Sequence, residues 1–217
     1  MPEELPAQSN LWLADTLWRL GAVQFGDFTL GRTTVHSPIH VNLRLLIAHP
    51  TALARAAHII VEELQTLQAM RNPQVDSFDL VCGVPFGGLV VGEAFSLYAK
   101  IPLIYLHPHT DDLESDVEGL YHPSQTALIM DDLITGGGSI ILTANRLRDE
   151  GLFVRDAVVL FDRQSGGRRK LAEVGIRLVS VLTLEVLLNY LRSSGKIGED
   201  WYRKSMAFFD ETKDREY

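Results

Sequence analysis

The second half of the chain alternates short apolar runs with helix-compatible stretches, and this alternation limits the fold more than any other feature. The apolar runs are FDLVCGV, IPLIYL, TALIMDD, AVVLFD and RLVSVL. Between them lie stretches such as GGLVVGEAFSLYAK and SIILTANRLRDEG, whose length and pattern suit helices. Runs that are apolar throughout and joined by crossovers are typical of a parallel sheet covered by helices on both faces. The sequence therefore predicts an α/β fold with ligands bound at the carboxyl ends of the strands.

The first part of the chain has a different pattern. LWLADTLWRLGA repeats apolar residues at helical spacing and stops at Gly21, which predicts a short amphipathic helix. VQFGDFTL and IHVNLRLL then predict two extended segments, and Pro50 is expected to open a long helix through Leu67.

The domain organisation follows from the absence of repeats and of long linkers in the sequence. We expect one domain over residues 1–217, with an N-terminal helix/strand hood at about 10–45, a core at about 46–195 and a C-terminal tail at about 196–217. The tail, which includes WYRKSMAFFDETKDREY, predicts a terminal helix docked on the body or on another subunit.

Charge and composition exclude several classes of protein. Twenty Lys and Arg against 28 Asp and Glu give a net charge of −8, opposite to the charge of a general nucleic-acid binder. No apolar run approaches the roughly 18 residues that span a bilayer, and MPEELPAQSN lacks the features of a secretory signal, so we expect a cytoplasmic protein. Cys82 has no partner for a disulfide. His36, His40, His49 and His58 show no metal-ligand spacing and are interpreted as structural.

The most informative segment is ALIMDDLITGGGS, residues 127–139, which leads into a predicted helix. A buried strand delivers the adjacent carboxylates Asp131 and Asp132, whose oxygens suit ribose hydroxyls or a hydrated Mg²⁺. The glycines of the following turn let backbone N–H groups converge on an anion at a helix N-terminus. The segment therefore predicts a phosphate site with a polyol or metal beside it.

With its flanks, this segment resembles the orotate phosphoribosyltransferase family of type I phosphoribosyltransferases. The resemblance covers roughly residues 10–195 and rests on FGDFTL, SPIHVNLR, VCGVPFGG, IPLIYL, LIMDDLITGGGS and AVVLFDRQSGGRRKLAEVGIRLVSVLTL, in that order. It implies transfer of phosphoribosyl from phosphoribosyl diphosphate to orotate, giving orotidine 5′-phosphate and pyrophosphate in pyrimidine synthesis. It also implies Mg²⁺ as cofactor and a homodimer.

The resemblance assigns roles to particular residues. Asp131 and Asp132 would hold the ribose hydroxyls, and Thr135 with Arg163 would face orotate, whose carboxylate matches a guanidinium fork. Arg32 lies near the position of the family's N-terminal lysine. The 5′-phosphate would be held within the segment Leu133, Ile134, Thr135, Gly136, Gly137, Gly138 and Ser139. The pyrophosphate-contacting loop would be Val84, Pro85, Phe86 and Gly87.

The chain departs from the family where the leaving group is expected. Family enzymes close the site with a basic loop from the neighbouring subunit, but here no Lys or Arg lies between Lys100 and Arg146. The loop within residues 107–122 instead carries the acids Asp111, Asp112, Glu114, Asp116 and Glu118. Gly87 also stands where a basic residue is expected. The cationic groups that normally stabilise the departing pyrophosphate are therefore missing from both places.

Two substitutes for these cations are considered: additional Mg²⁺ bridged by Asp111, Asp112 or Glu114, and proton donation from His107 or His109. Asp131, Asp132, His107 and His109 are accordingly the catalytic candidates. Three functions stay open: a divergent orotate phosphoribosyltransferase, a catalytically impaired protein that binds nucleotide or phosphoribosyl diphosphate, and a nucleic-acid-binding regulator. The net negative charge counts against the last of these.

Overall fold

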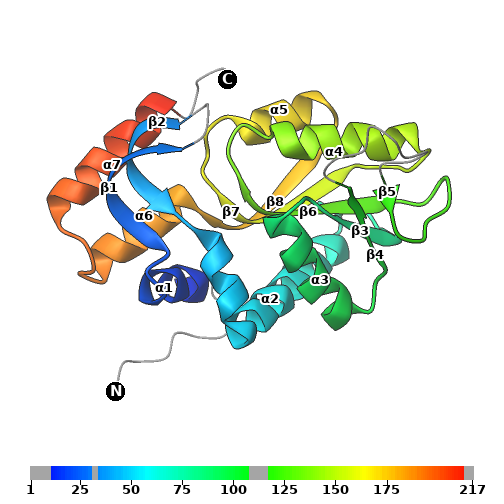
Figure 1. Ribbon diagram of the computed structural model, residues 1–217, viewed down its shortest axis with the longest axis horizontal. Helices are drawn as coiled ribbons and strands as arrows, with labels where there is room; N and C mark the ends of the chain where they lie inside the picture. The colour runs from blue at the N-terminus through cyan, green and yellow to red at the C-terminus, as the bar shows by residue number, and fades with distance from the viewer. Residues whose placement is uncertain (1–10, 31–33, 108–116, 213–217) are drawn as a thin grey trace.

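The computed structural model describes residues 11–30, 34–107 and 117–212. Its centre is a six-stranded sheet in the order β5-β4-β3-β6-β7-β8, and a separate two-stranded sheet pairs β1 with β2 (Figure 1). Neighbouring strands of the large sheet are parallel except for β4 and β5. The predicted α/β fold with a mostly parallel sheet is confirmed.

The strands and helices follow the apolar runs closely. The strands are β1 (Val23–Leu30), β2 (Thr34–Val41), β3 (Leu80–Gly83), β4 (Leu103–Leu106), β5 (Val117–Glu118), β6 (Ala127–Ile134), β7 (Asp156–Asp162) and β8 (Arg177–Thr183). The helices are α1 (Leu11–Arg19), the 3-10 helix η1 (Leu43–Ala48), α2 (Pro50–Ala69), α3 (Gly87–Ala99), α4 (Gly138–Asp149), α5 (Gly167–Glu173), α6 (Leu184–Ser193) and α7 (Glu199–Thr212).

One predicted segment differs in its extent. IHVNLRLL was expected to be extended throughout, but β2 ends at Val41 and Leu43–Ala48 forms η1. The turn matters for the site, because it redirects the chain at the mouth of the central sheet.

The side chains of the central strands divide between two apolar cores, one on each face of the sheet. Along β6, Leu128 and Met130 join the core that includes α1, α2, α3 and α6, whereas Ala127 and Ile129 join the core beneath α4 and α5. Both faces of the sheet are therefore covered, which explains why the strand sequences are apolar without alternation.

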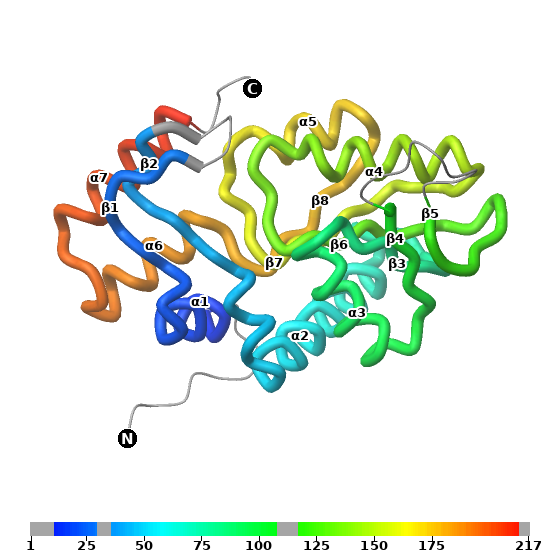
Figure 2. Tube along the Cα trace, viewed as in Figure 1, coloured from blue at the N-terminus to red at the C-terminus, as the bar shows by residue number. Residues whose placement is uncertain are grey.

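The last described helix, α7, lies beside the N-terminal hood. The C-terminal helix α7 packs against β2 and α6, and α6 in turn packs against α1 (Figure 2). The tail is thus docked on the body of its own chain, beside the N-terminal elements. Among the helices of the described segments, none combines the length and apolarity needed to span a membrane.

Strand order fixes where a ligand can bind. The chain runs from β3 outward to β4 and then returns to the other side of β3 as β6. Where successive connections leave in opposite directions, the carboxyl ends of the two central strands border a crevice. The loop after β3 and the Asp pair of β6 are brought together at this point.

Candidate active site

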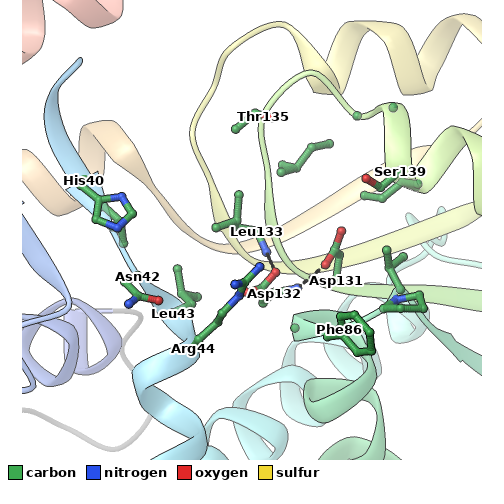
Figure 3. A pocket seen from close by; sticks show the side chains of 18 residues that line it. His40, Asn42, Leu43, Arg44, Phe86, Asp131, Asp132, Leu133, Thr135 and Ser139 are labelled. Atoms are coloured by element: carbon green, nitrogen blue, oxygen red, sulfur yellow. Dashed lines mark hydrogen bonds between the residues drawn. The ribbon is translucent and has the colours of Figure 1, made fainter. Parts of the chain in front are cut away.

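A cavity of about 630 Å³ opens at this crevice, a size that suits a small-molecule site. Its walls come from the end of β2, η1, the loop after β3, the end of β6 and the start of α4 (Figure 3). The lining residues are His40, Val41, Asn42, Leu43, Arg44, Val84, Pro85, Phe86, Gly87, Asp131, Asp132, Leu133, Ile134, Thr135, Gly137, Gly138, Ser139 and Ile140.

The Asp pair is held by the backbone of its own strand. Oδ1 of Asp131 accepts the N–H of Asp132 at 2.8 Å, and Oδ1 of Asp132 accepts the N–H of Leu133 at 2.9 Å (Figure 3). Burial, followed by the charge of Asp132, raises the pKa of Asp131 well above its usual value. The carboxyl oxygens that these two bonds leave over can bond to the hydroxyl groups of a polyol.

The glycine-rich turn forms an anion cradle at the start of α4. Gly137 takes the left-handed conformation, with φ of 79°, and no side-chain oxygen caps the helix. The first N–H groups of a helix have no intrahelical acceptor, so in α4 they are available to a phosphate. Thr135 and Ser139 place hydroxyl groups at the same wall.

The DRQSGG element supports this cradle from behind. A Cβ on Gly167 would collide with the carbonyl oxygen of Thr135, and a Cβ on Gly137 would contact the backbone of Gly167 at 3.4 Å. The two glycine-containing turns are therefore in direct contact. Their co-occurrence in the sequence reflects this close packing of backbones.

The loop after β3 and the start of α3 lie directly against the Asp pair at the cavity wall. A Cβ on Gly87 would overlap the carboxylate of Asp132, and the Phe86 side chain is 69% exposed at the rim. The carboxylate of Asp132 therefore occupies the space beside the backbone of Gly87, and a larger residue at position 87 would require that carboxylate to move.

Arg163 lies beside the cavity without forming part of its wall. It follows β7, is 7% exposed, and donates from Nη2 to the hydroxyl of Ser37 at 3.2 Å. Asp162 orders the turn, since its Oδ1 accepts the N–H of Gln164 at 2.7 Å. The structure therefore brings Arg163 to the hood side of the site, next to His40.

His40 was interpreted from the sequence as structural, but it lines the cavity. Its ring lies 5.5 Å from that of Phe28, and its buried Nδ1 has no hydrogen-bond partner in the described segments. Burial, followed by the positive charge of Arg163, lowers the pKa of His40. The cavity wall therefore includes an imidazole whose buried nitrogen has no partner among the described residues, close to the charge of Arg163.

The sequence reasoning also missed Asn42, Leu43, Arg44 and Ile140 as lining residues. SPIHVNLR contributed to the resemblance, but the overlapping segment IHVNLRLL was predicted to be extended. That prediction gave no indication of η1, the 3-10 helix that carries Arg44. Ile140 follows directly on the predicted cradle.

Other sequence predictions lie outside the cavity wall or outside the described residues. Gly136 does not line the cavity, and His107 is an exposed residue just after β4 that does not line it either. Arg32, His109, Asp111, Asp112, Glu114 and Asp116 lie outside the described residues. Within the described ranges, no group of three or more His, Cys, Asp or Glu side chains could hold a metal by itself.

The fold and this site define the chain as a type I phosphoribosyltransferase: a parallel sheet whose acidic strand end, glycine-rich cradle and facing loop surround one cavity. Many solved structures are similar to this fold. The UMP synthase of Leishmania donovani matches with a TM-score of 0.83 and 29% identity over 94% of this chain and 43% of that one. The orotate phosphoribosyltransferase of Aeropyrum pernix matches with a TM-score of 0.69 and 32% identity over 84% of this chain and 99% of that one.

Sequence similarity identifies the family. The orotate phosphoribosyltransferase of Chlamydia caviae is 40% identical over 190 residues, which cover 84% of this chain and 86% of that protein. The chain belongs to the orotate phosphoribosyltransferase family, as the sequence analysis predicted. No protein-family model matches the chain.

Proposed function

We propose that the protein transfers the phosphoribosyl group of phosphoribosyl diphosphate to orotate in pyrimidine synthesis. The observation that carries this proposal is the combination of family membership with an intact phosphoribosyl half of the site, formed by Asp131, Asp132 and the Thr135–Ser139 cradle. In the reaction, the ribose C1–oxygen bond breaks and its electron pair leaves with pyrophosphate. A ring nitrogen of orotate forms the new bond to C1 and gives up its proton to solvent.

The substrate would lie across the cavity in a fixed direction. The α4 N-terminus and Ser139 would bind the 5′-phosphate, and the Asp pair would hold the ribose hydroxyls. The diphosphate would then point toward η1 and the loop Val84–Gly87, and orotate toward Thr135, His40 and Arg163. Holding both reactants in this order is a large part of catalysis, because it makes the encounter effectively intramolecular.

Magnesium fits this arrangement as a companion of the substrate. Mg²⁺ is commonly bound by one or two carboxylates, substrate phosphates and retained waters, and the described residues offer two adjacent carboxylates and no larger ligand cluster. Asp131 and Asp132 would contact its water shell. When bound, the ion would neutralise part of the diphosphate charge.

The reaction is tested directly by the loss of orotate absorbance with phosphoribosyl diphosphate and Mg²⁺. We expect turnover with orotate and none with uracil, which lacks the carboxylate that Arg163 would recognise. Binding of orotidine 5′-phosphate without any turnover at high protein concentration would instead support the catalytically impaired binding protein. The family relationship favours the enzyme.

We also propose that the protein is a homodimer. Support comes from α3, where Leu97 and Tyr98 are 62% and 50% exposed although both are large apolar residues. Sedimentation should give twice the mass of one chain, and Leu97→Lys should shift the equilibrium toward the monomer. The cytoplasmic location and the absence of nucleic-acid binding stay predictions from the sequence, to be tested by fractionation and by a binding assay at low salt.

A further inference from the structure

The cavity contains a single permanent positive charge among the described residues that line it. Asp131 and Asp132 are the acids, His40 is an imidazole with a lowered pKa, and Arg44 is the cation. A site that binds a diphosphate beside two carboxylates needs cations to offset the repulsion.

Among the described residues, the segments that flank the loop after β3 and the Asp pair do not supply that charge. No Lys or Arg occurs between Lys100 and Arg146. Lys100 lies just beyond the far end of the 13-residue helix α3, whose other end borders the cavity, so about 20 Å of helix separate it from the site. Position 87 is a glycine and supplies no cation, and the carboxylate of Asp132 lies against its backbone.

Arg44 is placed to take this role. It lies on η1, which packs against α3 and β6, the two elements that carry the loop residue Gly87 and the Asp pair. Its side chain extends from η1 toward the strand end that carries Asp132 (Figure 3). Within the described part of the chain, no hydrogen bond or ion pair engages its guanidinium, so the charge is not neutralised by a protein carboxylate.

We propose that Arg44 binds the diphosphate of phosphoribosyl diphosphate and stabilises the charge that this group gains as it leaves. This inference rests on the proposed function and names the residue that replaces the missing basic side chains. A guanidinium suits the task, because it stays charged at every working pH and its planar donors match phosphate oxygens two at a time. Arg44 and the loop Val84–Gly87 line the same cavity, so both would contact the diphosphate.

The test separates the diphosphate from the rest of the substrate. Arg44→Gln removes the charge, Arg44→Lys keeps the charge without the fork, and Arg71→Gln is a matched control that removes an exposed arginine outside the cavity lining. Calorimetry should measure binding of phosphoribosyl diphosphate, pyrophosphate and orotidine 5′-phosphate to each variant, with Mg²⁺ present.

We expect Arg44→Gln to weaken binding of phosphoribosyl diphosphate and pyrophosphate by about tenfold or more, as loss of a charged hydrogen bond does. Orotidine 5′-phosphate, which has no diphosphate, should change less than about twofold, Arg44→Lys should fall between, and Arg71→Gln should match wild type. Unchanged pyrophosphate affinity in Arg44→Gln, or an equal loss for orotidine 5′-phosphate, would overturn the proposal.

The same measurements distinguish failure of this inference from failure of the proposed function. Ligand binding is read without turnover, so an inactive wild-type protein that binds pyrophosphate through Arg44 would contradict the enzymatic proposal alone. Turnover of orotate by Arg44→Gln with an unchanged KM for phosphoribosyl diphosphate would contradict the role of Arg44 alone. Since Arg44 is exposed, the variants are expected to melt at the wild-type temperature.

Discussion

Arg163 and Ser37, 126 positions apart in the chain, are joined by a hydrogen bond of 3.2 Å from Nη2 to Oγ. Ser37 is fully buried and donates its own hydroxyl proton to the carbonyl oxygen of Ile39 at 2.7 Å. The hydroxyl thus has a fixed direction, and it holds the guanidinium that follows β7 against strand β2 of the hood. The orientation of Arg163 depends on the two sheets being docked together.

Ser37→Ala should therefore impair recognition of orotate without removing any group proposed to touch it. With its acceptor lost, the guanidinium is less well oriented, and we expect the KM for orotate to rise by a factor of about 5 to 10, the equivalent of one ordinary hydrogen bond. The KM for phosphoribosyl diphosphate should hardly change. Arg163→Ala is the comparison: it should abolish discrimination between orotate and uracil, and unchanged orotate affinity in that variant would remove Arg163 from the base site.

Asp131→Asn should stabilise the fold while weakening function. Because the pKa of Asp131 is raised in the folded protein, ionisation opposes folding above the pKa of the unfolded chain, and stability falls as pH rises toward the folded pKa. An amide avoids this effect, so we expect a gain of about 1 kcal/mol at neutral pH and little gain near pH 4. Urea unfolding at both pH values measures it.

Binding of orotidine 5′-phosphate tests whether Asp131 and the neighbouring Asp132 hold the ribose. Asp132→Asn should weaken binding of orotidine 5′-phosphate by about 1 to 3 kcal/mol through loss of a charged hydrogen bond to ribose. If both amide variants bind the nucleotide as tightly as wild type, the Asp pair does not hold the ribose.

Gly167→Ala should disturb the phosphate cradle from outside the cavity. The new methyl group would collide with the carbonyl oxygen of Thr135 and approach the Ile134 side chain at 2.8 Å. We expect a stability loss of about 1 to 3 kcal/mol, as is usual for overpacking, together with weaker binding of ribose 5-phosphate. Gly198→Ala is the control, since a Cβ there meets nothing within 4 Å. Equal melting temperatures for the two variants would contradict the close packing of the glycine turns.

His40→Phe should change how stability depends on pH. The pKa of His40 is lowered from 6.5 in the folded protein. Below about pH 6.5, His40 is therefore protonated to a greater extent in the unfolded chain than in the folded chain. Wild type therefore loses stability as pH falls through this window, and the phenylalanine variant should lose less. The variant also removes a buried nitrogen without a partner, for a gain of about 1 kcal/mol at pH 7. Parallel denaturation curves at pH 5 and pH 7.5 for both proteins would show the prediction to be wrong.

The amino-acid sequence by itself determined the fold class and half of the site. Apolar runs without alternation predict buried parallel strands because both faces of such a strand are covered, and β3, β4, β6, β7 and β8 lie where those runs lie. The sequence also indicated that Asp131, Asp132 and the glycine turn belong to one site, because they are contiguous within one strand-turn-helix unit, and the structure places them along one cavity. Local sequence suffices where the groups that act together are neighbours in the chain.

Only the tertiary structure decided which distant residues complete the site. His40 and Arg44 come from the end of β2 and from η1, and they meet the Asp pair because the strand order places these ends around one crevice. Likewise, the backbone of Thr135 lies where a Cβ of residue 167 would be, and the carboxylate of Asp132 lies where a Cβ of residue 87 would be. Such relations arise from contact between segments far apart in sequence. The spacing of residues along the chain does not predict these contacts, because tertiary packing determines which distant side chains lie close together.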